Sequence, residues 1–277
     1  MAGTVYSGKN IYITGGSSGI GLASAKLFSS LGANVIIFAR RKDLLEEALE
    51  TIRSCRVSSS QRFSFVSVDV KDHSLVARFL TGAAKDFGKP DILINSAGIA
   101  YPNYFEKITP DMFELTIKTN ILGVWNVLSN LAPLMKESGG HIVNVSSVAG
   151  FLGIFGYTAY SASKFAVIGM SESLRSEMKP FGVRVSVLCP PDTDTPGLSY
   201  ENITKPSETK AISGSAGIMS PDTVARYMVR GMEKGQFLII PGFEGKAVHF
   251  IKGILPRLVD VFMDFKVRQV QRNRRKI

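Results

Sequence analysis

The chain has 277 residues, is 45% hydrophobic and carries a net charge of +10. These values suit one large α/β domain, or at most two small ones, and the lack of an internal repeat or a long low-complexity stretch excludes a repeat array. Much of the charge is local, because the last dozen residues hold six Lys or Arg and no acid. No nucleic-acid-binding module is visible, so we expect no nucleic-acid partner.

The sequence shows no pattern typical of a metal site, a disulfide framework or a signal peptide. Cys55 and Cys189 lie far apart, which favours a reducing compartment, and the three histidines are scattered, so we expect no metal. The N-terminus runs into a strand without the basic and apolar segments of a signal peptide. No run of 18 residues is uninterruptedly apolar. We therefore expect a cytoplasmic protein without an ordinary membrane span.

Short runs rich in Val, Ile and Phe alternate with amphipathic stretches, as expected for strands buried on both faces of a sheet. The predicted strands are 10–14, 34–39, 63–70, 91–95, 141–147, 184–190 and 237–241. The predicted helices include 19–31, 41–54, 73–87, 110–136 and 157–179. This alternation predicts a Rossmann-like, doubly wound α/β domain over residues 1–243, with a seven-stranded parallel sheet and helices on both faces.

A glycine-rich turn follows the first predicted strand, where the chain reads TGGSSGIG. Glycines at 15, 19 and 21 permit a tight turn and let backbone N–H groups approach a pyrophosphate at the N-terminus of the next helix. A plain tight turn is the alternative, but the position between strand and helix favours nucleotide binding. The predicted phosphate-binding residues are Thr14, Gly15, Ser17, Ser18, Gly19, Ile20 and Gly21.

The end of the second strand indicates which dinucleotide is bound. Many nucleotide sites carry an acid there for the ribose hydroxyls, but this chain has Ala39 followed by Arg40 and Arg41. An arginine can pair with a 2′-phosphate, and the missing carboxylate removes repulsion. We therefore expect NADPH/NADP+ rather than NADH, bound by Arg40. Arg41 is equally well explained as the start of an exposed helix.

The stretch YTAYSASK contains two tyrosines and one lysine. Tyr160 and Lys164 are four residues apart and share one helix face, whereas Tyr157 lies two turns from the lysine. An ammonium at ~4 Å contributes about 4 kcal/mol at an effective dielectric of ~20. That is roughly three pKa units, which predicts a Tyr160 pKa lowered toward neutrality and a role as proton donor.

Two later segments break the strand–helix alternation. Segment 192–220 is rich in Ser, Thr, Pro and Gly and follows the sixth strand, where ligands bind in such folds. We interpret it as a substrate lid with one or two short helices. Segment 244–277 has apolar residues at helical spacing from Val248 to Phe265, with an interruption at Pro256, and a basic tail. It predicts an amphipathic helix that packs on the core or a partner subunit, or binds an anionic membrane surface peripherally.

With TGGSSGIG, NSAG (95–98), NILG (120–123), IVNVSS (142–147) and YSASK in this order, residues 8–242 resemble the short-chain dehydrogenase/reductase family. The resemblance implies that Tyr160 donates a proton as hydride arrives from the nicotinamide. It implies that Lys164 binds the nicotinamide ribose and lowers the Tyr160 pKa, and that Ser147 rather than Ser146 aligns the substrate oxygen. It implies that a backbone carbonyl at Asn120 holds a water of a proton relay.

The resemblance also implies further contacts and an assembly. Asp69 and Val70 would hold the adenine, and Tyr157 would line the substrate pocket. The other cofactor contacts it implies are Asn95, Ala97 and Gly98 beside the adenosine ribose and Pro190, Thr193 and Thr195 around the nicotinamide. A homodimer or homotetramer is usual in the family, through helices that include the one carrying Tyr160.

The turn after the sixth strand departs from the family pattern, since Pro191 stands where the family usually has glycine. This makes the turn stiffer. The string PPDTDTPG instead resembles the 3-ketosphinganine (3-ketodihydrosphingosine) reductases, which implies NADPH-dependent reduction of a long-chain lipid ketone. The alternatives are a reductase of steroids or other carbonyl compounds and a catalytically silent NADP(H)-binding sensor. The complete set of Asn120, Ser147, Tyr160 and Lys164 argues against the sensor.

Overall fold

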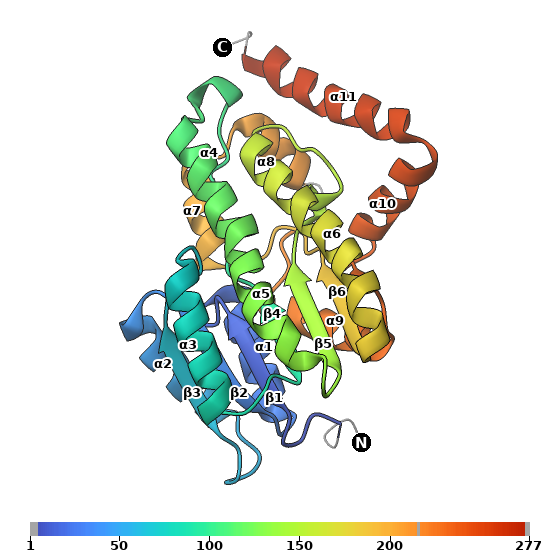
Figure 1. Ribbon diagram of the computed structural model, residues 1–277. Helices are drawn as coiled ribbons and strands as arrows, with labels where there is room; N and C mark the ends of the chain where they lie inside the picture. The colour runs from blue at the N-terminus through green and yellow to red at the C-terminus, as the bar shows by residue number, and fades with distance from the viewer. Residues whose placement is uncertain (1–4, 215–216, 275–277) are drawn as a thin grey trace.

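The computed structural model describes residues 5–214 and 217–274. Seven parallel strands form one sheet in the order β3-β2-β1-β4-β5-β6-β7, with helices on both faces (Figure 1). The strands are β1 (Asn10–Thr14), β2 (Asn34–Ala39), β3 (Phe63–Ser67), β4 (Ile92–Asn95), β5 (Gly140–Val145), β6 (Val183–Leu188) and β7 (Leu238–Ile239). The predicted Rossmann-like fold is confirmed. Several predicted strands are shortened, β3 and β7 most, because these two are the sheet edges and pair on one side only.

The two faces of the sheet bury separate hydrophobic cores, since successive strand residues point to opposite faces. Ile11 and Ile13 pack with the helices that follow β1 and β2, whereas Tyr12 packs on the other face. The main covering helices are α1 (Gly19–Ser30), α2 (Lys42–Ser54) and α9 (Pro221–Glu233) on one face and α3 (His73–Asp86), α5 (Gly123–Met135) and α6 (Thr158–Met178) on the other.

The predicted helix 110–136 is divided by a π-helical turn. It consists of α4 (Pro110–Ile117), the π turn Lys118–Leu122 and α5. A π turn changes the regular i→i−4 pairing and is common at functional sites. Asn120, a predicted site residue, lies inside this turn.

Two segments of the last third of the chain, 192–214 and 244–274, lie at the carboxyl ends of the strands. Segment 192–220 contains α7 (Pro196–Thr204) and α8 (Ser207–Ser213), as predicted, although residues 215–216 lie outside the described part. Two further helices, α10 (Glu244–Ile254) and α11 (Pro256–Arg274), meet at Pro256, and α11 packs against α8 (Figure 1). Over residues 5–214 and 217–274, every helix is too short or too polar to cross a bilayer.

Candidate active site

The glycine-rich turn has the close backbone packing expected of a phosphate loop. Gly15 has a φ of +68°, its N–H donates to the Phe38 carbonyl at 2.8 Å, and a Cβ here would lie 2.8 Å from the Ala97 nitrogen. A Cβ on Gly21 would lie 2.2 Å from the Gly15 carbonyl oxygen. The loop is therefore drawn tightly over the ends of β1, β2 and β4.

The N-terminus of α1 fits a bound pyrophosphate. Ser18 is the N-cap residue, but its side chain makes no capping hydrogen bond, and the first turn holds no acid. The first N–H groups of a helix need partners from outside the helix, and the dipole there favours an anion. The loop and this helix end would hold the phosphates of a nicotinamide dinucleotide, which supplies hydride when bound.

The adenosine side is formed at the ends of β2 and β3. Arg40 is exposed directly after β2. Asp69 and Val70 lie in the loop just beyond β3 rather than in the strand. The Asn126 side chain on α5 donates to the Val70 carbonyl at 2.9 Å and fixes this loop. Asn126 was not among the predicted residues, because the contact joins positions 56 apart that no sequence spacing links.

The segment after β4 connects the phosphate loop to the catalytic residues. Thr14 Oγ1 accepts a hydrogen bond from the Ala97 N–H at 3.3 Å. A Cβ on Gly98 would lie 3.3 Å from Asn120 Oδ1 and 3.4 Å from Lys164 Nζ, so a larger residue would crowd both. The Asn95 side chain is instead buried in the fold, where its amide donates to Asn144 Oδ1 at 2.8 Å.

Asn120 holds the wall of the site through its side chain. Its amide donates to the Ile99 carbonyl and to Ser163 Oγ, each at 2.9 Å, and its Oδ1 accepts from the Ile99 N–H at 2.9 Å. The amide is fully buried. These three side-chain contacts hold the π turn against both α6 and the segment after β4. They do not use the backbone carbonyl of Asn120, which could therefore hold the water of a proton relay.

Ser147 and Tyr160 face one another, whereas Ser146 is used elsewhere. The Ser147 hydroxyl lies close enough to the Tyr160 phenol to lower the pKa of that phenol. The Ser146 hydroxyl is buried and donates to the Lys164 carbonyl at 2.9 Å. The structure therefore brings together Ser147, Tyr160 and Lys164, with Asn120 adjacent.

The predicted lowering of the Tyr160 pKa is wrong for the protein alone. Burial raises the pKa of the Tyr160 phenol, the Glu201 carboxylate raises it further, and the hydrogen bond to Ser147 lowers it. Lys164 Nζ lies 5.5 Å from the centre of the Tyr160 ring and donates to the Val145 carbonyl at 2.9 Å. Burial also lowers the pKa of Lys164 to about 8. The helical spacing placed Lys164 near the Tyr160 ring, but desolvation decides the direction of the Tyr160 pKa.

The residues predicted to contact the nicotinamide lie in the chain after β6. Thr193 is buried with its hydroxyl donating to the Pro191 carbonyl at 2.8 Å, and Thr195 caps α7 by accepting from the Leu198 N–H at 3.2 Å. The Pro190 carbonyl accepts from the Val148 N–H at 3.1 Å. A Cβ on Gly19 would lie 2.9 Å from Thr195 Cγ2, so the base of the lid contacts the phosphate loop.

The comparison with protein families agrees with this geometry. The short chain dehydrogenase family matches residues 9–205, which include the phosphate loop and all four predicted catalytic residues. The chain belongs to this family. It is accordingly an oxidoreductase that uses a nicotinamide cofactor.

Similar proteins include reductases with related names. The 3-dehydrosphinganine reductase of Danio rerio is 39% identical over 86% of this chain and 73% of its own length. The 3-ketodihydrosphingosine reductase of Bos taurus is 40% identical over 86% of this chain and 72% of its own length. Among solved structures, a short chain dehydrogenase/reductase from Burkholderia phymatum in complex with NAD has a TM-score of 0.79 and 25% identity, covering 91% of this chain and 95% of its own.

One part of this short-chain dehydrogenase site was missed by the sequence analysis. The Tyr157 hydroxyl donates to Glu201 on α7 at 2.5 Å, and Lys205 pairs with Asp192 at 2.9 Å. Glu201 and Lys205 are four residues apart. In a helix this spacing predicts an ion pair between the two side chains on the surface. The fold instead buries Lys205 and pairs it with an acid at the start of the lid.

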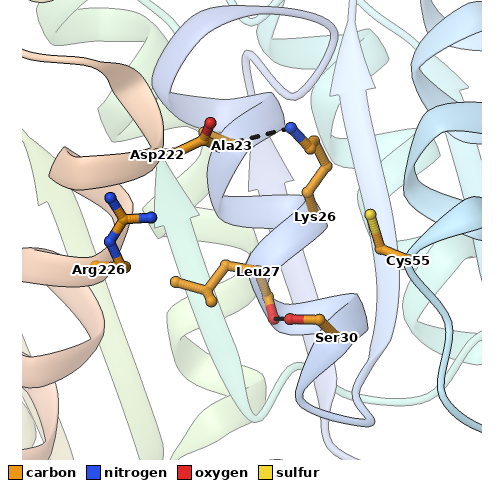
Figure 2. A pocket seen from close by; sticks show the side chains of 7 residues that line it. All are labelled: Ala23, Lys26, Leu27, Ser30, Cys55, Asp222 and Arg226. Carbon is orange, nitrogen blue, oxygen red and sulfur yellow. Dashed lines mark hydrogen bonds and ion pairs between the residues drawn. The ribbon is translucent and has the colours of Figure 1, made fainter.

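A separate hollow in the short-chain dehydrogenase domain lies away from these residues (Figure 2). It is bounded by α1, the end of α2 and α9, and Lys26 pairs with Asp222 across it at 3.6 Å. Its lining residues are Ala23, Lys26, Leu27, Ser30, Cys55, Asp222 and Arg226. None of them belongs to the predicted site, so the hollow has no part in the chemistry described above.

Proposed function

We propose that this enzyme reduces 3-ketosphinganine to sphinganine with NADPH. The observation that carries the proposal is the placement of the half-buried Ser147 and Tyr160 beside the buried Lys164, in a chain about 40% identical to reductases named for this ketone. The lid string PPDTDTPG supports the same substrate.

The residues divide the reaction between them. Reduction adds hydride from the bound nicotinamide to the carbonyl carbon and a proton to the carbonyl oxygen. Ser147 aligns that oxygen by a hydrogen bond and Tyr160 gives it the proton. The raised pKa keeps Tyr160 protonated at neutral pH, which suits reduction of a ketone. Lys164 holds the nicotinamide ribose, and the backbone at Asn120 holds the water that returns a proton to the site.

Two other functions are less well supported. A reductase of steroids or other carbonyl compounds would use the same catalytic residues, but the similar reductases are named for the sphinganine ketone. A silent NADP(H) sensor would not need the Ser147 hydroxyl beside the Tyr160 phenol. The test is an NADPH-oxidation assay of the purified protein with 3-ketosphinganine, a steroid ketone and small ketones. Turnover of 3-ketosphinganine with the highest kcat/KM supports the proposal, and preference for another ketone refutes it.

The NADPH preference is supported by Ala39 and by the exposed Arg40 that follows β2. We expect at least about tenfold preference for NADPH over NADH in kcat/KM, about 1.4 kcal/mol, for a charge-assisted pair with the 2′-phosphate. The double variant Ala39→Asp, Arg40→Ala should erode or reverse it. Arg41→Ala is the matched control, and equal use of both cofactors by the wild type would refute the preference.

We also propose that an anionic membrane surface is a partner. The C-terminal helices, α10 and α11, expose many large apolar residues, namely Phe250, Ile254, Leu255, Leu258, Val261, Phe262 and Phe265. Residues 244–277 also contain nine Lys or Arg and three acids, although Arg275 and Lys276 lie outside the described residues. An apolar helix face beside basic residues suits peripheral binding to anionic lipid, on the cytoplasmic face of a membrane, and would give access to a lipid ketone.

We further propose a homodimer or homotetramer. The outer surfaces of the π turn, α5 and α6 expose Leu122, Trp125 and Phe165, which supports association through these helices. Light scattering during size-exclusion chromatography would measure the mass. A monomer at micromolar concentration would refute this assembly.

A further inference from the structure

The lid places a carboxylate beside the catalytic tyrosine. Glu201 on α7 accepts a hydrogen bond of 2.5 Å from the Tyr157 hydroxyl. The Tyr157 ring is buried and lies 5.3 Å, centre to centre, from the ring of Tyr160. Only the Tyr157 side chain therefore separates the carboxylate from Tyr160, and the carboxylate is near enough to raise the pKa of the Tyr160 phenol.

Glu201 is not neutralised by an ion pair within the described residues. The nearest lysine along the chain, Lys205, forms its ion pair with Asp192 instead. Burial raises the pKa of the Glu201 carboxyl. The hydrogen bond from Tyr157 opposes this effect, and Lys205 and Lys164 oppose it less, from beyond ion-pair distance. A half-buried carboxylate of this kind is stabilised by a cation that comes close to it.

We propose that Glu201 binds the ammonium group of an α-amino ketone substrate and so selects for it. The inference rests on the proposed function, since 3-ketosphinganine carries its amine on the carbon next to the ketone. When Tyr160 contacts the ketone oxygen, that amine must lie within a few ångströms of the phenol. Glu201 is the carboxylate that the lid holds there, and Tyr157 positions it by its hydrogen bond.

The rival explanation is that Glu201 only fastens α7 to α6 through Tyr157. The variant Glu201→Gln separates the two roles, because the glutamine carbonyl can still accept the hydrogen bond from Tyr157 but carries no charge. A matched control is Glu177→Gln, which removes one carboxylate from the exposed surface of α6.

The experiment measures kcat/KM for two ketones with saturating NADPH. One is 3-ketosphinganine, and the other is its deamino analogue, in which hydrogen replaces the amine. A hydrogen bond to a charged group corresponds to a preference of about 10- to 100-fold. We expect the wild type and Glu177→Gln to prefer the amine by this factor. We expect Glu201→Gln to lose the preference through a higher KM for 3-ketosphinganine, with the KM for the deamino analogue unchanged.

The outcomes distinguish this inference from the function on which it rests. If Glu201→Gln lowers kcat/KM equally for both ketones, Glu201 is a fastening residue and the inference is overturned. If the wild type reduces both ketones equally well, the proposed function stands and the role in amine binding is overturned. If the wild type reduces neither ketone, the proposed function fails and the inference fails with it.

Discussion

At the scale of single residues, proton transfer to a ketone depends on the groups that surround the Tyr160 phenol. Burial and the Glu201 carboxylate raise the pKa of Tyr160, and the hydrogen bond to Ser147 opposes them. A phenol that stays protonated is ready to donate to a ketone oxygen. The same surroundings leave Lys164, with a pKa lowered to about 8, as the nearby cation that favours loss of that proton.

Replacing Tyr160 with phenylalanine removes the proton donor without changing the shape of the site. We expect kcat for the ketone to fall by about 10²- to 10⁴-fold, the usual contribution of a general acid, while NADPH binding stays nearly unchanged. Tyr157→Phe is the control in the same helix and should be far milder, since that hydroxyl contacts Glu201. Stopped-flow turnover and cofactor titration measure the two effects. A Tyr160→Phe enzyme with most of its activity would contradict the assignment.

His141 makes the fold sensitive to acid. It is buried in β5 with Nε2 2.8 Å from Ser186 Oγ, and burial, with a smaller effect from Arg184, lowers its pKa from 6.5 to about 4. Between these values the unfolded chain binds a proton that the folded chain does not. The stability contributed by neutral His141 is therefore present above about pH 6.5 and is lost as the pH falls through about 4.

The loss of unfolding free energy due to His141 can be measured against a variant that has no titratable group at this position. By about pH 4 the wild type should lose up to about 3 kcal/mol of unfolding free energy more than His141→Gln, which keeps a hydrogen-bonding group at the position. Urea unfolding at about pH 7 and about pH 4.5 gives the comparison. A stability difference between the two proteins that does not change with pH would show that His141 titrates normally.

At the scale of elements, short irregular segments place the reactive groups. The π turn at Lys118–Leu122 holds Asn120 against Ile99 and α6, and the turn between β1 and α1 opens a helix end toward phosphate. In both segments the regular hydrogen bonding of the helix backbone is interrupted, which leaves backbone N–H or C=O groups for the site. The regular strands and helices around them supply the rigidity.

Gly15→Ala tests the turn between β1 and α1. Its φ of +68° and a Cβ 2.8 Å from the Ala97 nitrogen predict a loss of at least ~1 kcal/mol of unfolding free energy and weaker NADPH binding. Gly82→Ala is the control, because a Cβ in this part of α3 meets open space and should stabilise the helix by about 0.5–1 kcal/mol. Urea unfolding and cofactor titration would show both. Equal effects of Gly15→Ala and Gly82→Ala on stability and NADPH binding would contradict this role of the turn.

At the scale of the whole molecule, the lid and the C-terminal helices lie at the same end as the site. Both are at the carboxyl ends of the strands, and α11 packs on α8 (Figure 1). Lys252 on α10 donates to the Phe151 carbonyl at 2.5 Å, and His249 packs edge-on against the Phe151 ring at 4.9 Å. The C-terminal helices are thus attached to the catalytic domain while most of their large apolar side chains remain exposed.

The exposed side chains predict binding to anionic liposomes. The wild type should float with them, and less in high salt, because screening weakens attraction to the basic residues. Phe262→Glu with Phe265→Glu should reduce binding about tenfold or more, since burial of one such side chain contributes about 1.5–3 kcal/mol. Val57→Glu, exposed in the loop after α2, is the control and should bind normally. Failure of the wild type to bind at low salt would show that this surface has another partner.

The sequence by itself determined the features that are local or periodic. Strand and helix alternation, the glycine turn at Gly15 and the spacing of Tyr160 from Lys164 depend on residues that are near one another in the chain. The fold and the proximity of Tyr160 and Lys164 could therefore be predicted. The interruption at Pro256 was predictable for the same reason, because proline cannot donate the backbone hydrogen bond that a continuous helix needs.

The tertiary structure alone decided the electrostatics of the site. The pKa of Tyr160 depends on how completely the fold excludes water around it, and this desolvation outweighs the one ammonium that the helical spacing indicated. The partner of Lys205 is Asp192 rather than Glu201, because the lid folds back on itself and brings distant charges closer than helical neighbours. Burial and charge pairing sum over contacts from many segments, and no single stretch of sequence contains them.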